Sequence, residues 1–228
     1  MRFRHLAFAV FFSGWFTPSF AETGSAQDAL PLPDAACSYA GNFTQDRYLS
    51  GIAEPIRTAG QFYFHCEYGV VWATQEPIKD VLILHRNGRG LQMSPDQAAK
   101  KLKSRQSKFL GQLLTTLMAG DQAALRELFE ISATETAYQY QLLPRQRKLK
   151  RGIQHLVLDL AQLQPLLDQS EMSSKEKALG IEILDRNHQT TRIAATQTRQ
   201  FEPTDNAAAQ CASMTDLGAE YCDLLFGL

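Results

Sequence analysis

The chain has 228 residues, of which 44% are hydrophobic, and its formal net charge is −1. This length and composition fit one globular domain with a sizeable core. A net charge so close to zero argues against a general nucleic-acid binder, because such proteins present a strongly basic surface.

The first residues have the features of a secretory signal. Arg2 and Arg4 give a positive start, and the apolar run from Leu6 to Phe16 is too short to span a bilayer as a mature helix. Ser19-Phe20-Ala21 places small residues at the positions that a signal peptidase reads, and we expect cleavage after Ala21.

Cleavage at this point divides the chain into a signal peptide, residues 1–21, and a single domain, residues 22–228. We expect the mature domain to be soluble and exported to the periplasm. The alternative is an uncleaved membrane anchor, which the short apolar run disfavours.

Four cysteines, Cys37, Cys66, Cys211 and Cys222, form an even set that suits an oxidising compartment. They contain no CxxC pair, so zinc binding and thioredoxin-type chemistry are both disfavoured. Four cysteines allow three pairings. A bond between Cys211 and Cys222 would close a short loop and is plausible, which leaves Cys37 with Cys66. Buried free thiols are the alternative.

Residues 43–93 are predicted to form a meander of antiparallel strands. Aromatic and β-branched residues fill the runs Gln61 to Cys66, Val70 to Thr74 and Val81 to His85, and a fourth short run follows. Asn87-Gly88 favours the mirror-image turn that joins antiparallel strands.

Residues 95–130 change to helical periodicity. Ser94-Pro95-Asp96-Gln97 has the composition of a helix start, and Gly120-Asp121 separates this helix from a second one over Gln122 to Phe129. The first helix is expected to bear a basic face, formed by Lys100, Lys101, Lys103, Arg105 and Lys108.

The remainder of the chain returns to strand patterns. Strands are predicted over Thr136 to Leu143, Gly152 to Leu160, Leu179 to Asp185 and Thr190 to Thr198. The Ala-rich tail is expected to end in a short helix from Asp216 to Phe226.

The strands alternate imperfectly between apolar and polar residues, and the run from Val81 to Leu84 is apolar throughout. Much of the sheet must therefore be covered on both faces, or enclose a cavity on one face. A sheet of eight or more antiparallel strands curls strongly. The predicted fold is α+β: an incomplete antiparallel β-barrel, or curled sheet, with helices forming a lid over an apolar cavity.

Several short motifs resemble those of the LolA family of periplasmic carriers of outer-membrane lipoproteins. The matching stretches, in chain order over most of residues 40–200, are Asn42-Phe43-Thr44-Gln45, Gly60-Gln61-Phe62-Tyr63-Phe64, Gly69-Val70-Val71-Trp72 with Glu76-Pro77, Leu142-Leu143-Pro144-Arg145, and the hairpin Leu179 to Ile193. Each motif alone is weak, and their order and spacing give the resemblance its weight.

The resemblance implies a carrier that holds acyl chains of a lipoprotein or lipid in an apolar cavity and moves them toward the outer membrane. It implies an inner-membrane donor and an outer-membrane acceptor, and we expect a monomer without a cofactor. Burying each CH₂ group is worth about 0.8 kcal/mol, so acylated cargo does not cross water unaided at a useful rate.

One position departs from the family pattern. Well-studied members have an Arg-Pro before the Trp strand, and that arginine ties the barrel to the lid. The corresponding stretch in this chain is His65-Cys66-Glu67-Tyr68-Gly69, without an arginine. The resemblance therefore gives no lid latch for this chain, and no transporter that loads it.

Apolar residues of the strands and of the first helix are the candidates for lining the cavity. They are Phe62, Phe64, Val70, Trp72, Leu82, Leu84, Leu113 and Leu117. Ordinary core packing is an equally good interpretation of each one. Val70 and Trp72 rank highest, because the resemblance and the strand pleat both place them together.

A basic run is the other conspicuous feature of the sequence. Its cations, Arg145, Arg147, Lys148, Lys150 and Arg151, are candidates for docking an acidic partner or anionic headgroups. A solvated loop between strands is the simpler interpretation.

Two other classes of function compete with the carrier. A periplasmic sensor or scaffold would use the same fold to bind a protein partner through its basic surface. An enzyme would need a polar constellation in the cavity, for instance around His65, His85 or His155. No HExxH, Gly-x-Ser-x-Gly or dinucleotide-loop context is found, so no catalytic residue and no metal site is predicted.

Overall fold

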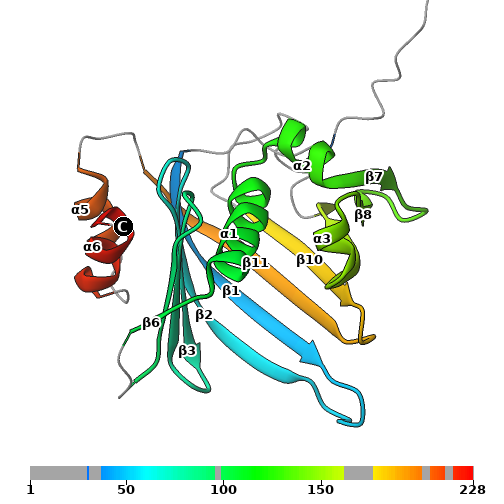
Figure 1. Ribbon diagram of the computed structural model, residues 1–228, viewed down its shortest axis with the longest axis horizontal. Helices are drawn as coiled ribbons and strands as arrows, with labels where there is room; N and C mark the ends of the chain where they lie inside the picture. Colours follow the sequence, from blue (N-terminus) through cyan, green and yellow to red (C-terminus); the bar gives the residue numbers. More distant parts are fainter. Residues whose placement is uncertain are drawn as a thin grey trace, which may run out of the picture.

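The structure is a computed structural model, which describes residues 30, 37–95, 99–161, 177–201, 206–213 and 218–227. The predicted signal peptide and its cleavage point lie outside these residues. Figure 1 shows a single curled sheet with helices on both of its faces.

Eleven strands form one antiparallel sheet in the order β6-β5-β4-β3-β2-β1-β11-β10-β9-β8-β7. The first group is β1 (Ser38–Tyr48), β2 (Ile56–His65), β3 (Gly69–Glu76), β4 (Asp80–His85), β5 (Gly90–Met93) and β6 (Lys100–Lys101). The second group is β7 (Phe129–Ala133), β8 (Gln139–Pro144), β9 (Ile153–Asp159), β10 (Lys177–Asp185) and β11 (Thr190–Gln200). The sheet stays open, with β6 and β7 as its two edges.

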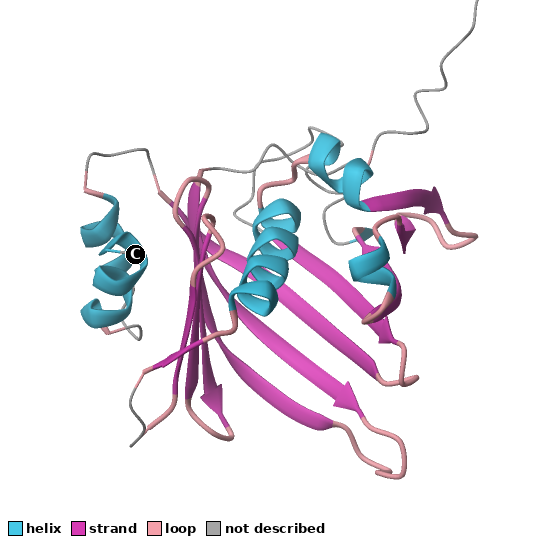
Figure 2. Cartoon of the chain, in the orientation of Figure 1, coloured by secondary structure: helices cyan, strands magenta, loops and turns pink. Residues whose placement is uncertain are grey.

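The helices are α1 (Ser104–Met118), α2 (Gln122–Leu128), α3 (Arg147–Lys150), α5 (Ala207–Ala212) and α6 (Ala219–Gly227). Helix α1 packs against β3, β4 and β5 on one face, which we call the inner face. Helices α5 and α6 form a hairpin on the opposite, outer face, where α6 packs against β3 and β4. Figure 2 shows this arrangement. The predicted curled sheet with covering helices is therefore confirmed.

The first helix begins later than the sequence predicted. Lys100 and Lys101 belong to the short edge strand β6, which pairs with Leu91 and Gln92 of β5, and α1 starts only at Ser104. Residues 96–98 of the expected helix start lie outside the described part. The prediction failed because β5 would otherwise leave its backbone hydrogen-bonding groups unpaired at the edge of the sheet, and β6 pairs with them. The helix-start signal at Ser94 is local and does not predict this pairing.

A second difference concerns β7, which the sequence pattern did not predict. Phe129 was expected to end a helix, but it begins a strand that pairs with Pro144 at the end of β8. The strand has only five residues and a weak apolar alternation, so its pairing with β8 decides its conformation rather than its own pattern.

Side chains that alternate along the central strands belong to different hydrophobic cores, one on the inner face of the sheet and one on the outer face. On β2, Phe62 and Phe64 join the inner core, whereas Tyr63 joins the outer core with Val71 and Ile83. A third cluster packs α1, α2 and α3 against β8, β9 and β10 on the inner face. The central sheet is thus covered on both faces, as its nearly continuous apolar runs predicted.

Candidate functional site

The inner face of the sheet contains two adjacent rows of apolar side chains across β2, β3 and β4. Phe62 lies opposite Trp72, which lies opposite Leu82. In the next row Phe64 lies opposite Val70, which lies opposite Leu84. Six of the eight candidate lining residues therefore share one face of three neighbouring strands.

The other two candidates come from α1, the helix that lies over this face. Leu113 and Leu117 are buried and pack in the cluster that joins α1 to β8, β9 and β10. Helix α1 thus contacts both halves of the curled sheet, β3 to β5 on one side and β8 to β10 on the other. The structure buries six of the eight candidates and leaves Trp72 and Leu82 partly exposed.

Aromatic rings organise the inner face around Trp72. The indole is stacked on Phe43 with ring centroids 3.9 Å apart, and on Phe62 with centroids 5.7 Å apart. Tyr39 contacts Phe62 edge-on at 5.9 Å. Phe43 is buried and holds one side of the indole, so Trp72 has a fixed orientation beside α1.

Beyond α1, partly exposed apolar residues continue across the other half of the sheet. Phe43 lies opposite Ala195 of β11, which lies opposite Leu179 of β10. Ile193 packs beside them at the margin of the core. We call the following partly exposed set the inner strip: Trp72, Leu82, Leu179, Ile183, Ile193 and Ala195.

Sequence reasoning missed four members of the inner strip. The strand around Ile193 and Ala195 is rich in Thr, Arg and Gln, and its apolar residues are small or isolated. The pairing of Ile193 with both Gln45 and Ile181 identifies its face, and this pairing joins segments far apart in the chain. The alternation in Thr191 to Ala195 was the available signal.

Helix α1 is fastened to the sheet by a tyrosine. The Tyr39 hydroxyl donates a buried hydrogen bond of 2.7 Å to the carbonyl oxygen of Met118, at the end of α1. Burial raises the pKa of Tyr39 far above its usual range, so its hydroxyl stays protonated and donates. The stretch from His65 to Gly69 contains no arginine, and Tyr39 makes its sheet-to-helix contact from another strand, β1.

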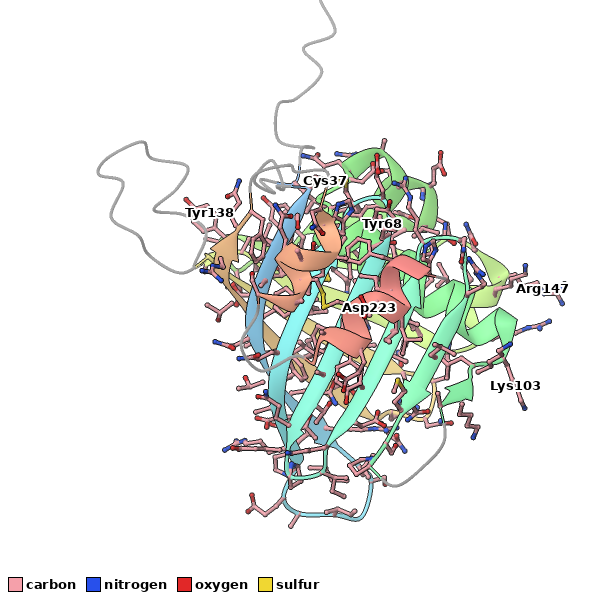
Figure 3. All side chains as sticks on the ribbon, turned by 90° about the vertical axis from the view of Figure 1, so that its left-hand side faces the viewer. Cys37, Tyr68, Lys103, Tyr138, Arg147 and Asp223 are labelled. Carbon is pink, nitrogen blue, oxygen red and sulfur yellow. A yellow bond between two sulfur atoms is a disulfide. The ribbon has the colours of Figure 1, made fainter. Side chains whose placement is uncertain are left out.

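The outer face is sealed by the α5–α6 hairpin and its disulfide. Cys211 is bonded to Cys222 across the two helices, and both are fully buried beside Tyr63 and Val71. Figure 3 shows α6 lying across the strands on this side, close to Tyr68. These contacts leave the outer face of β3 and β4 as packed protein core.

The second disulfide joins Cys37 to Cys66, so both bonds follow the pairing considered plausible from the sequence. A ring nitrogen of His65 and these two sulfur atoms lie within 4.8 Å of one another. A disulfide sulfur is not a thiolate, however, and thiolates are what bind metals. This group therefore fits a structural bond and not a metal centre.

The histidines considered for an enzyme lie away from the inner face. Nδ1 of His65 accepts a hydrogen bond from the Glu67 amide, and Nδ1 of His85 accepts one from the Asn87 amide. Both rings contact Tyr68. His155 follows the outward side of β9, since its neighbour Leu156 faces the inner core. The hydrogen bonds of His65 and His85 therefore stabilise turns.

The basic run folds as the single-turn helix α3 rather than as a loop. Leu149 is buried in the inner core and anchors the turn, while Arg145, Arg147, Lys148, Lys150 and Arg151 are exposed around it. Arg145 also donates from Nε to the carbonyl of Phe129 at 3.0 Å. Burial of Leu149 thus fixes the position of the helical turn around which these cations lie.

Comparison with known proteins gives a limited result. No family model and no curated protein matches the chain. Among solved structures, it is similar to a LolA superfamily protein from Nitrosomonas europaea, at 12% identity and a TM-score of 0.41, over 79% of this chain and 92% of that chain. At this identity and TM-score the likeness adds nothing to the case for a function, for which the inner strip is the relevant observation.

Proposed function

We propose that the mature chain, residues 22–228, is a periplasmic carrier that binds the acyl chains of a lipoprotein or lipid on its inner face. It moves this cargo toward the outer membrane without making or breaking a bond. The observation that supports the proposal is the inner strip, where large apolar side chains stay partly exposed beside a helix.

The inner strip suits an acyl chain on physical grounds. Each CH₂ moved from water to an apolar surface gains about 0.8 kcal/mol, so a chain laid along several such side chains is held without any polar contact. Trp72 offers the largest surface, and its ring is already held in place by Phe43.

The two faces of the sheet differ in what they offer a ligand. The outer face is closed by α5 and α6, and their disulfide reduces the freedom of this cover to open. On the inner face α1 is tied at its last residue by the Tyr39 hydroxyl. A hydrogen bond is more easily broken than a disulfide. Of these two covers, α1 is therefore the one whose displacement would enlarge the site and uncover Phe62 and Leu84.

The disulfides support the proposed compartment. Two disulfides fit an oxidising environment. Among the described residues, no helix is both long enough and apolar enough to cross a membrane. With the predicted signal peptide, the disulfides support export to the periplasm. The proposed route has a donor at the inner membrane and an acceptor at the outer membrane. We expect the carrier to act as a monomer.

Mass spectrometry of an organic extract of the gently purified periplasmic protein tests the proposal directly. Stoichiometric acylated material is expected, and it names the cargo class. A protein that is consistently free of lipid contradicts a constitutive carrier.

Trp72 provides a second and more local test. The chain has two tryptophans, Trp15 and Trp72, so cleavage after Ala21 leaves Trp72 as the single fluorophore of its kind. Fatty acids brominated along the chain are expected to quench it. Ile193→Glu should abolish this quenching, whereas Leu143→Glu, at an exposed outward position on β8, should not. Equal quenching in both variants would place the acyl chain elsewhere.

A further inference from the structure

The antiparallel topology brings three turns to the same end of the sheet. Ile153 at the start of β9 pairs with Asp185 at the end of β10, and Thr190 at the start of β11 pairs with Tyr48 at the end of β1. The helix α3, the β10–β11 turn and the β1–β2 hairpin are therefore neighbours in this order. Figure 1 shows the two hairpins side by side below α3.

One part of this end is cationic. Arg186 of the β10–β11 turn donates from Nε to the carbonyl of Lys150 at 2.7 Å, which joins it to α3. The exposed cations gathered at this corner are Arg145, Arg147, Lys148, Lys150, Arg151 and Arg186.

The carboxylate next to Arg186 in the chain is that of Asp185. Asp185 accepts hydrogen bonds from the amides of Asn187 and Gln189 in its own turn. The ion pairs found within the described residues join Arg57 to Asp46 and Arg192 to Glu182, on neighbouring strands. The six exposed cations outnumber the one carboxylate of Asp185, so the α3 corner keeps an excess of positive charge that faces solvent.

The adjoining hairpin tip exposes two isoleucines, with one exposed carboxylate, Glu54, between them in the chain. At the tip of the β1–β2 hairpin the side chains of Ile52 and Ile56 are 53% and 46% exposed. Tyr48 lies at the base of the same tip, under the guanidinium of Arg192 at 5.2 Å. Arg47 donates to Gln189 at 3.2 Å, so this hairpin is tied to the cationic corner by a hydrogen bond.

We propose that these two parts form one docking rim for the surface of an anionic lipid membrane. The cations of α3 and Arg186 contact headgroup phosphates, and Ile52 and Ile56 enter the interfacial layer. Cations near an anionic leaflet each contribute to binding, and aliphatic tips beside them add apolar burial. The rim would act whether or not the inner strip takes an acyl chain, so it goes beyond the proposed carrier function.

The chemistry of the rim favours a membrane over a protein partner. A stable protein interface needs a contiguous patch of about 1,000 Å² with buried aromatic or arginine anchors. On the rim the exposed apolar residues are Ile52, Ile56 and Tyr48 of one narrow hairpin, and the cations surround a single helical turn. Such separated contacts suit a fluid surface whose headgroups rearrange around them.

Co-sedimentation of the mature protein with vesicles tests the rim. We expect binding to vesicles of phosphatidylethanolamine with phosphatidylglycerol, and none to vesicles of phosphatidylcholine alone. Added salt should weaken the binding, because exposed charges are screened. Failure to bind the anionic vesicles at low salt overturns the proposal, and equal binding to both kinds overturns its cationic part.

A matched pair of variants locates the charges. Arg147→Gln with Arg151→Gln should weaken binding about 30-fold, since each cation near the surface contributes on the order of 1 kcal/mol. Arg89→Gln with Arg199→Gln removes the same charge from exposed positions at the opposite end of the sheet and should have little effect. An equal loss in both pairs would overturn the rim, because net charge alone would then drive binding.

The isoleucines are tested separately. Ile52→Ser with Ile56→Ser should weaken binding about 10-fold or more, and Ile52→Leu with Ile56→Leu should retain it. Thermal unfolding confirms that each variant is folded. Quenching of Trp72 by brominated fatty acid should stay unchanged in the arginine variant, so that loss of membrane docking and loss of acyl binding are told apart.

Discussion

The hydroxyl of Tyr39 donates a buried hydrogen bond of 2.7 Å to the carbonyl oxygen of Met118, which is the last residue of helix α1. The last carbonyls of a helix have no partner within the helix. Tyr39 therefore supplies from β1 the donor that the end of α1 lacks, and it fixes the position of this helix over the inner face.

Replacing Tyr39 with phenylalanine should destabilise the protein by about 1–3 kcal/mol, because a buried carbonyl loses its partner while the ring remains. Urea unfolding measures this loss. Amide hydrogen exchange of α1 should increase, since the end of the helix is no longer tied to the sheet.

The control for this change is Tyr63→Phe. Tyr63 shares a 2.8 Å hydrogen bond with the hydroxyl of Ser38 and belongs to the outer core. Its loss should also lower stability but leave exchange in α1 unaltered. Faster exchange of α1 in both variants would mean that general destabilisation, rather than the bond to Met118, loosens the helix.

Phe43→Ala should cost about 3–5 kcal/mol, because it removes a fully buried ring from the core. It also removes the ring stacked 3.9 Å from Trp72, so tryptophan emission of the mature chain should shift to the red. Phe43→Leu should restore most of the stability but not the stacking. An unshifted emission spectrum for both variants would contradict the stacked geometry.

Removing the disulfide of α5 and α6 with Cys211→Ser and Cys222→Ser should lower stability by about 3 kcal/mol. The two cysteines are 11 residues apart, and the helices cover Val71 and Ile83. Loss of the bond should therefore increase binding of a hydrophobic dye and cleavage by protease within residues 206–227.

The matched control replaces Cys37 and Cys66, which are 29 residues apart, with serine. Chain entropy predicts a somewhat larger loss, about 4 kcal/mol, but this bond links β1 to β2 and leaves α5 and α6 attached. If protease cleaves the C-terminal helices to the same extent in both variants, the bond between Cys211 and Cys222 is not what holds these helices on the sheet.

The stability of the protein should fall in mildly acidic solution through two histidines. Burial lowers the pKa of His65, against the opposing charge of Glu67. Burial and then Arg89 lower the pKa of His85, against its hydrogen bond with Asn87. The folded state thus prefers both rings neutral.

The unfolded chain takes up protons first as pH falls below about 6.5, so this stability is present above that pH and is lost as pH falls toward the lower folded-state values. Urea unfolding between about pH 7.5 and about pH 5 measures the slope. His65→Asn with His85→Asn keeps an acceptor near each Nδ1 position and should flatten it. An unchanged slope would assign the acid sensitivity to carboxylates.

Local sequence patterns determined much of the fold. The apolar runs that became β2, β3 and β4 placed Phe62 and Trp72 on one face and Tyr63 and Val71 on the other, because side chains alternate along a strand whatever lies next to it. The even set of cysteines in a chain with a signal-like start also predicted two disulfides.

Tertiary contacts decided the rest. The inner strip depends on pairing β1 with β11, which places Ala195 opposite Phe43 although the two strands lie far apart in the chain. Strand β7 and the late start of α1 were likewise set by neighbouring strands that satisfy backbone hydrogen bonds. The proposed docking rim arises in the same way, since the antiparallel strand order brings the turns that carry Ile52, Lys150 and Arg186 to one end of the sheet. The sequence by itself determined which residues alternate and are buried, because those preferences are local. Only the folded sheet decided which distant residues share a surface, because that depends on strand order and register.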